Sequence, residues 1–283
     1  MQIITANQLI LGTVLAAVFA AVSILLKFLT PLGGVAAFFV GVSVFGFGGV
    51  PFAAILLAFF ISSSLLSKFR VRQKQKANSL NAKTGRRDAA QVIANGLVAS
   101  LLAVGYALDL RFAPPRFCML LFIAVMSTVN ADTWATEIGG LSRRRPILIS
   151  TFKKVAVGQS GAISVLGTAA ALLGASFIAF VGWGFWPERS VALLWRPDMA
   201  ELLACVWAGF LGCFADTLLG ASIQSKYRCQ ICGEELEGIE HCNAPSLRFK
   251  GLRWMTNDTV NFVSSLTGLV FAIVLLKAST GVK

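Results

Sequence analysis

The chain of 283 residues is 56% hydrophobic and only 13% charged, and its mean hydropathy is +0.75. Soluble proteins carry about a quarter of charged residues, so this composition excludes an ordinary soluble fold. Apolar stretches of bilayer-spanning length recur along the whole chain. The sequence therefore predicts a single integral membrane domain over residues 1–283, with an all-α polytopic helix bundle in a lipid bilayer.

The net charge of +12 is explained by topology rather than by nucleic-acid binding. A nucleic-acid-binding surface normally comes with a soluble recognition module, and the sequence shows none, so we expect no nucleic-acid partner. Residues 68–88, 139–157 and 222–256 hold eight, five and five of the 25 Lys and Arg residues. Because cytoplasmic loops accumulate Lys and Arg, we expect these three loops in the cytoplasm and the protein in the plasma (inner) membrane.

We expect about eight transmembrane helices, with seven as the alternative. The apolar stretch 32–66 is too long for one span at a rise of about 1.5 Å per residue. Residues 46–51 have the glycine- and proline-rich composition of a turn that would divide it. A single long tilted helix would place the N-terminus on the other side of the membrane. The helices are expected near residues 9–26, 32–46, 50–67, 89–108, 117–138, 160–184, 200–221 and 259–277.

Two expected helices carry an aspartate close to their cytoplasmic C-terminal end, Asp132 and Asp216. A charged side chain within a bilayer helix costs about 2.5–3.5 kcal/mol on insertion scales. The helix dipole also disfavours an anion near a C-terminus, so these carboxylates indicate a functional site. Asp258 begins the last helix, where complementing the helix dipole is an equally good explanation. All three aspartates are followed by threonine.

Other polar residues occupy the same ends of neighbouring helices. Gln91 and Asn95 are one turn apart at the start of one helix, and Asn257 and Asn261 are one turn apart at the start of another. If these helices are neighbours, they form one polar pocket just inside the cytoplasmic leaflet. Residues 158–161 form a Gly- and Ser-rich turn before a helix, which suits phosphate. A small-residue helix-packing seam explains the glycines and serines of residues 158–168 equally well.

This set of residues fits phosphoryl transfer, in which positioning and charge neutralisation supply most of the rate. Mg²⁺ typically binds one or two carboxylates together with phosphate oxygens. The expected catalytic residues are Asp132, Asp216 and Asp258. The expected Mg²⁺ ligands are these three with Asn130 and Asn261. The expected substrate- and nucleotide-binding residues are Arg87, Gln91, Asn95, Lys153, Lys154, Gly158, Ser160, Gly161, Gln224 and Asn257.

The cytoplasmic loop 222–256 contains Cys229, Cys232, His241 and Cys242. A CxxC pair followed by a histidine and a cysteine is able to form a tetrahedral Zn²⁺ site. Neighbouring residues such as His241 and Cys242 seldom both bind one ion comfortably, which weakens this interpretation. A structural Zn²⁺ site and a simple tether or lid over the pocket both remain open.

Together these motifs resemble the family of integral membrane proteins that includes transmembrane protein 19 of animals and the phytyl-phosphate kinase of plant chloroplasts. The resemblance covers roughly residues 30–275. For the plant branch it implies transfer of a phosphoryl group from a nucleoside triphosphate, of CTP type, to a membrane-bound isoprenyl monophosphate. The matching segments are Gln91–Gly96, Asn130–Gly139, Gly158–Thr168, Asp216–Gln224, the Cys229/Cys232/His241/Cys242 loop, and Trp254 through Asn257, Asp258 and Asn261.

The main alternative is a transporter or flippase of a lipid phosphate or another small anion. Such a protein should carry polar residues across the whole membrane, whereas the outer halves of these helices are almost free of them. A scaffold or insertase does not require paired Asp-Thr motifs at helix ends. The sequence therefore favours an enzyme that works from one face of the membrane, a phosphotransferase resembling a prenyl- or phytyl-phosphate kinase.

Overall fold

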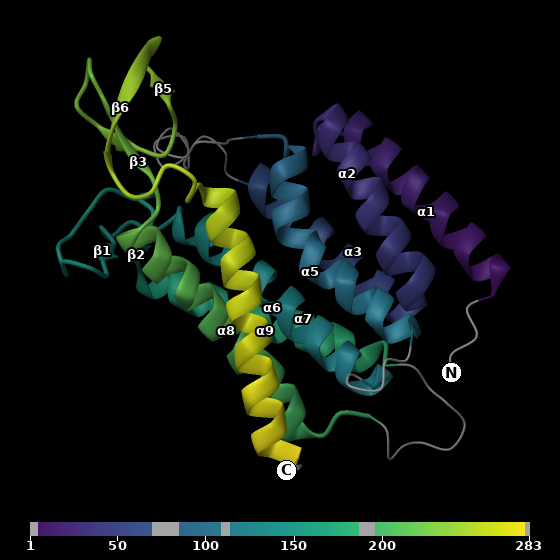
Figure 1. Cartoon of the computed structure of the whole chain (residues 1–283). Helices are drawn as coiled ribbons and strands as arrows, with labels where there is room; N and C mark the ends of the chain where they lie inside the picture. The colour runs from purple at the N-terminus through teal and green to yellow at the C-terminus, as the bar shows by residue number, and fades with distance from the viewer. Residues whose placement is uncertain (1–4, 70–84, 109–113, 187–195, 281–283) are drawn as a thin grey trace.

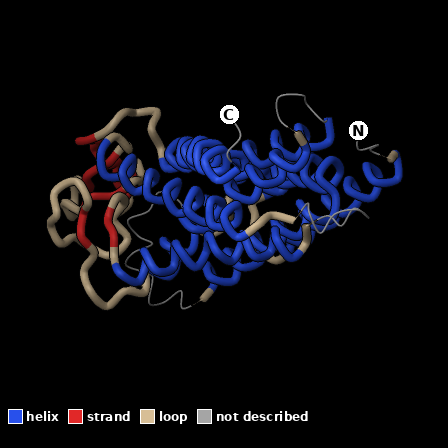
Figure 2. The backbone as a smooth tube through the Cα atoms, turned by 90° about the horizontal axis from the view of Figure 1, so that it is seen from below, coloured by secondary structure: helices blue, strands red, loops and turns tan. Residues whose placement is uncertain are grey.

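The computed structural model describes residues 5–69, 85–108, 114–186 and 196–280. Within them, seven helices are long and apolar enough to cross a membrane. They pack side by side as a bundle with a small β-sheet at one end (Figures 1 and 2), so the predicted polytopic helix bundle is confirmed. The helical elements are α1 (Ala6–Leu25), α2 (Pro31–Gly41), the π-helix η1 (Val42–Phe47), α3 (Gly48–Lys68), α5 (Ala89–Leu108), α6 (Pro115–Gly139), α7 (Val165–Gly184), α8 (Met199–Ser222) and α9 (Asn257–Thr280).

The second of these spans, Pro31–Lys68, is a helical hairpin. Gly49 interrupts it with φ +70° and ψ −160°, a conformation that only glycine adopts readily. Arg87 joins the two ends, since its carbonyl accepts from the Thr30 N–H at 3.0 Å and its guanidinium donates to Ser64 Oγ at 3.4 Å. A straight helix of 38 residues would hold its ends about 57 Å apart. The expected division of this stretch is therefore confirmed, and the described chain crosses the bundle eight times.

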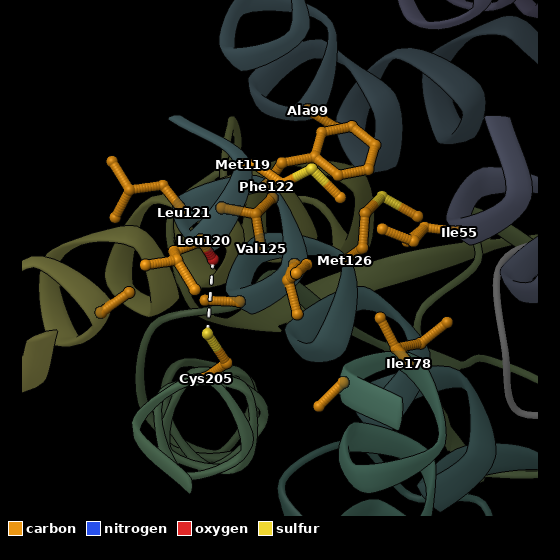
Figure 3. Packing of buried hydrophobic residues seen from close by; sticks show 14 of the residues in the cluster. Ile55, Ala99, Met119, Leu120, Leu121, Phe122, Val125, Met126, Ile178 and Cys205 are labelled. Carbon is orange, nitrogen blue, oxygen red and sulfur yellow. Dashed lines mark hydrogen bonds between the residues drawn. The ribbon is translucent and has the colours of Figure 1, made fainter. Parts of the chain in front are cut away.

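Helix α6 is the centre of the bundle and packs against α3, α5, α7, α8 and α9. Every residue from Cys118 to Ala131 is buried, as expected for a helix that is surrounded on all sides. Figure 3 shows α6 side chains among Ile55 of α3, Ala99 of α5 and Ile178 of α7. This packing fixes the position of the next turn of α6, which carries Asp132.

Close contacts between α6, α8 and α9 bring their polar ends together. Thr128 of α6 fits against Gly212 of α8 and Gly268 of α9. A Cβ atom at Gly268 would lie 2.1 Å from Thr128 Oγ1, so this approach requires glycine. Small residues allow membrane helices to pack at such short range. Asp132 and Asp216, each one turn beyond these contacts, are thereby held near the start of α9.

The polar segment between α8 and α9 is a folded sheet of four antiparallel strands in the order β4-β3-β6-β5. Tyr227 pairs with Leu236, Cys229 with Ser246, and His241 with Ala244. A separate pair of strands, β1 (Ile147–Leu148) and β2 (Ala162–Ile163), lies in the segment between α6 and α7. The strands of the larger sheet are β3 (Lys226–Cys229), β4 (Glu235–Leu236), β5 (Glu240–His241) and β6 (Ala244–Lys250).

At the end of the bundle away from the sheet, Arg116 of α6 makes a two-pronged ion pair with Glu201 of α8. Glu201 is only 3% exposed and also accepts from the Asp198 N–H at 3.0 Å. Replacing Arg116 by alanine leaves this carboxylate buried without its cation, and we expect the free energy of unfolding to fall by about 3–5 kcal/mol. Denaturant unfolding in detergent micelles measures this loss.

The double variant Arg116→Met/Glu201→Leu removes both charges, and we expect it to recover most of the lost stability. Arg144→Ala, at an exposed loop position, is the control and should leave the unfolding transition unchanged. A single Arg116→Ala variant as stable as the wild type would show that the pair does not hold α6 to α8.

Candidate functional site

A cavity of about 1170 Å³ opens at the sheet end of the bundle. It is larger than the range of about 300–1,000 Å³ typical of small-molecule sites, so it has room for two ligands. Described residues from all three basic loops line it, which confirms that these loops share one end; of loop 68–88, residues 70–84 lie outside the described part. The predicted residues at its wall are Arg87, Gln91, Asn95, Asp132, Gly158, Ser160, Gly161, Asp216, Gln224, Asn257, Asp258 and Asn261.

Seven predicted site residues do not line this cavity. Asn130 is buried within the bundle, where its amide donates to the Gly174 carbonyl at 2.8 Å and accepts from Ser62 Oγ at 3.4 Å. It therefore joins α6 to α7 and α3. Lys153 and Lys154 are exposed on the segment after β1. The four Cys and His residues of the sheet come together at a separate place, outside the cavity wall.

The acidic part of the wall comes from three helices that are far apart in sequence. Asp132 of α6 and Asp216 of α8 are close enough for their charges to interact directly. In the orientation that its partners require, the Asn261 amide of α9 donates to Asp216 Oδ2 at 3.1 Å. Asp258 lies one turn before Asn261 on the same helix. A cation stabilises neighbouring carboxylates in a partly buried site, and an all-oxygen donor set of this kind suits Mg²⁺.

Glu237 adds a carboxylate that the sequence pattern did not indicate. It lies between β4 and β5, lines the cavity, and accepts from the Gln224 amide at 2.9 Å. Its charge acts on both Asp132 and Asp216. Helical periodicity locates residues at the ends of spans, but it says nothing about which side chain of a loop folds back over them.

Positively charged residues of the cavity wall come from the loop before α2, the end of α3 and the segment just before α5. Lys27, Lys68 and Arg86 line the cavity beside Arg87, and the first three were not predicted. Burial lowers the pKa of Arg87 to about 10, while the nearby Glu137 carboxylate acts in the opposite direction. Arg87 therefore stays charged at neutral pH.

The turn 158–161 packs against the C-terminal end of α8. Gly161 has φ +81°, and a Cβ atom there would lie 2.4 Å from the Ala221 backbone. Ser160 Oγ donates to the Gln224 amide oxygen at 2.6 Å, and Lys226 Nζ donates to the Ser160 carbonyl at 2.9 Å. The turn thus holds Gln224 and the base of the sheet at the cavity.

The expected helix start at residue 160 is wrong. Strand β2 follows the turn, and α7 begins at Val165, where Ser164 accepts from the Gly167 N–H at 3.1 Å as the N-cap. The physical reason is that Gly161 adopts a left-handed conformation and the next two residues pair with β1. Ser164, Gly167 and Thr168 line the cavity, so the N-terminus of α7, with its N–H groups and positive dipole end, faces the site directly.

A small apolar crevice lies between α2, η1, α3 and α5, next to the large cavity. Its wall includes Ala37, Val40 and Phe60. Arg87, Gln91 and Asn95 line both the crevice and the cavity. The crevice has a volume of about 50 Å³, and these three residues form the boundary between it and the polar cavity.

Comparison with known proteins agrees with this architecture. The family model described as "Integral membrane protein DUF92" matches residues 14–269. The chain belongs to this family. It is 28% identical to Protein PGR of Arabidopsis thaliana over 92% of this chain and 93% of that protein, and 27% identical to Protein VTE6, chloroplastic, of the same plant over 87% and 65%.

An uncharacterized membrane protein of Methanocaldococcus jannaschii is 31% identical over 66% of this chain and 73% of that protein. No solved structure matches the chain. The resemblance to an integral membrane family with a chloroplast member is confirmed. DUF92 membership establishes an integral membrane protein.

Proposed function

We propose that the protein is a membrane enzyme resembling an isoprenoid-phosphate kinase, which transfers a phosphoryl group from a nucleoside triphosphate of CTP type to a prenyl or phytyl monophosphate. The observation that carries this proposal is the junction at Arg87, where a polar cavity with carboxylates and cations meets an apolar crevice. A prenyl phosphate has the same division into a charged head and an apolar tail. The resemblance to the family of the plant phytyl-phosphate kinase supports the same substrate class.

The cavity wall supplies the groups that such a reaction needs. Asp132, Asp216 and Asp258, with Asn261, would hold Mg²⁺, which neutralises phosphate charge when bound. Arg87 and Lys68 would hold the monophosphate of the acceptor. An oxygen of this monophosphate attacks the γ-phosphorus, the bond to the bridging oxygen breaks, and a nucleoside diphosphate leaves. The acceptor oxygen is already ionised, so this transfer depends on positioning rather than on a general base.

A lipid-phosphate or small-anion transporter is the second candidate, and the centre of the bundle argues against it. The cavity opens at the sheet end, whereas α6 from Cys118 to Met126 is buried in packed side chains and carries no charged or amide group. A transport path needs polar groups along its length. We expect the sheet end to face the cytoplasm, where nucleotides are available.

The decisive experiment is product formation by the purified protein in nanodiscs. CTP or ATP labelled at the γ-phosphate is supplied with Mg²⁺ and a panel of geranyl, farnesyl, geranylgeranyl and phytyl monophosphates. We expect a labelled prenyl diphosphate. Absence of turnover with every pair, from protein that unfolds cooperatively, would reject the kinase and make uptake of labelled prenyl phosphate into vesicles the next measurement.

The apolar crevice gives a prediction about substrate length. Replacing Ala37 by phenylalanine fills the crevice, so we expect kcat/KM for phytyl monophosphate to fall about 10- to 100-fold, because each buried methylene is worth about 0.8 kcal/mol. The value for a five-carbon prenyl monophosphate should change little. Val35→Phe places the same side chain on the exposed side of α2 and is the control. Equal losses for long and short substrates would show that the tail does not enter this crevice.

A further inference from the structure

Four potential metal ligands converge on one side of the sheet, outside the cavity. The Sγ atoms of Cys229, Cys232 and Cys242 and a ring nitrogen of His241 all lie within 4.8 Å of one another. His241 Nδ1 is 3.4 Å from Cys232 Sγ and 3.3 Å from Cys242 Sγ. A tetrahedral site with Zn–S of about 2.3 Å and Zn–N of about 2.0–2.1 Å separates sulfur from nitrogen by about 3.5 Å. The spacing of these atoms therefore matches a zinc site.

The backbone around Cys229 has the form of a metal-binding turn. The Ile231 N–H donates to Cys229 Sγ at 3.4 Å, and the Gly233 N–H donates to the Cys229 carbonyl at 3.0 Å. Gly233 has φ +72°, which lets the chain turn back immediately after Cys232. Both cysteines of the CxxC pair consequently face the same point.

His241 and Cys242 are adjacent in sequence, and the local backbone conformation lets both side chains reach the same point. Cys242 and Asn243 adopt left-handed conformations with φ +53° and +56°. Such conformations are uncommon outside glycine, and here they turn the Cys242 side chain toward the same point as His241. Cys242 and Asn243 are the two central residues of the β5–β6 hairpin, in which His241 pairs with Ala244, and a two-residue type I′ turn has φ > 0 at both positions. The hairpin turn itself therefore sets His241 and Cys242 at the same point.

We propose that Cys229, Cys232, His241 and Cys242 bind one Zn²⁺ ion in a closed structural site. Three sulfur donors and one imidazole are the soft set that selects Zn²⁺ over Mg²⁺, and four protein ligands leave no position for a reacting water. The site is distinct from the oxygen-lined cavity, and its existence does not depend on the proposed kinase activity.

The position of the cluster gives the metal a structural task. Cys229 ends β3, His241 ends β5, and the chain between them carries Glu237, which reaches the cavity and bonds Gln224. The two-residue strands β4 and β5, the buried Leu236 and the polar contacts of Glu235 and Glu237 hold the stretch between these ends. The Zn²⁺ ion therefore fastens both ends of the segment that closes over the cavity.

The test is metal analysis of the full-length protein in detergent, purified without added metal or chelator. We expect about one zinc ion per chain for the wild type. Cys232→Ser and Cys242→Ser should each lower the zinc affinity at least tenfold. Replacing a residue that only hydrogen-bonds to a metal ligand already lowers metal affinity by about 10- to 100-fold, and these variants remove a ligand itself. Ile231→Ala, an exposed position within the same turn, and Cys118→Ser, within the bundle, should keep their zinc.

Replacing Zn²⁺ by Co²⁺ in the wild-type protein gives a second measurement, which does not depend on whether the cysteine variants fold. Thiolate-to-cobalt charge-transfer absorption and the visible bands of tetrahedral cobalt should appear in the wild type and in Ile231→Ala. Wild-type protein that contains no zinc, that contains iron in its place, or that shows a Cys229–Cys232 disulfide by mass spectrometry would overturn the proposal. Zinc retained by both cysteine variants would overturn it as well.

Discussion

Replacing Asp216 by asparagine is expected to reduce turnover of prenyl phosphate by about 1,000-fold or more. A bound metal ion contributes several kcal/mol of charge stabilisation in a phosphoryl-transfer transition state, and each 1.4 kcal/mol is worth about tenfold in rate. Asp216 contacts Asn261 and interacts electrostatically with Asp132, so it lies at the centre of the acidic cluster. Asparagine keeps the shape of the side chain and removes the charge that holds the ion.

The measurement is initial rate against Mg²⁺ concentration for the wild type, Asp132→Asn, Asp216→Asn and the double variant. Residues that act on one ion are strongly non-additive, so we expect the double variant to lose little more than either single variant. Asp198→Asn is the matched control, because it makes the same change at the other end of α8, where asparagine caps a helix as well as aspartate. Full activity in Asp216→Asn would contradict the proposed metal site.

The sequence was sufficient to predict that Asp132 and Asp216 belong to a functional site, because a charged side chain within a membrane helix needs a partner, a cavity or a function. A carboxylate near the C-terminal end of an apolar helix is disfavoured both by the helix dipole and by the bilayer, so a residue without a function is seldom found there. The three basic loops defined which ends lie together. This argument identifies Asp132 and Asp216, whereas Asp258 begins a helix, where the dipole explains it equally well; all three line the cavity.

Residues outside the helices were predicted less well, for a physical reason. Lys153 and Lys154 directly precede the glycine-rich turn 158–161, as the prediction required, yet both side chains are exposed on the segment between β1 and β2. Lys27 and Glu237 reach the cavity from segments without a helical period. Asn130 and Asp132 lie near the same end of α6 but on different faces of the helix. Gly174 of α7 packs close to Asn130, and the Asn130 side-chain amide donates to its carbonyl within the bundle.

Arg87 lies where the phosphate head group of the acceptor would meet its apolar tail. Its replacement is expected to have the second large effect on activity. It lines both the cavity and the crevice, its guanidinium lies over the rings of Phe59 and Phe60 at 5.6 and 5.4 Å, and it donates to Ser64. These contacts hold a fixed cation at the boundary between polar and apolar walls. A guanidinium in this position is suited to two-pronged recognition of a phosphate.

We expect Arg87→Gln to lower kcat/KM for the prenyl phosphate by about 100- to 1,000-fold, the usual cost of removing one preorganised donor from a developing charge. KM for the nucleotide should change little, because the change is confined to the acceptor side. Arg87→Lys restores the charge without the planar fork, so it should recover only part of the loss. The exposed Arg144→Gln is the control for lost positive charge. Equal losses for both substrates in Arg87→Gln would indicate that Arg87 holds the bundle together rather than the acceptor phosphate.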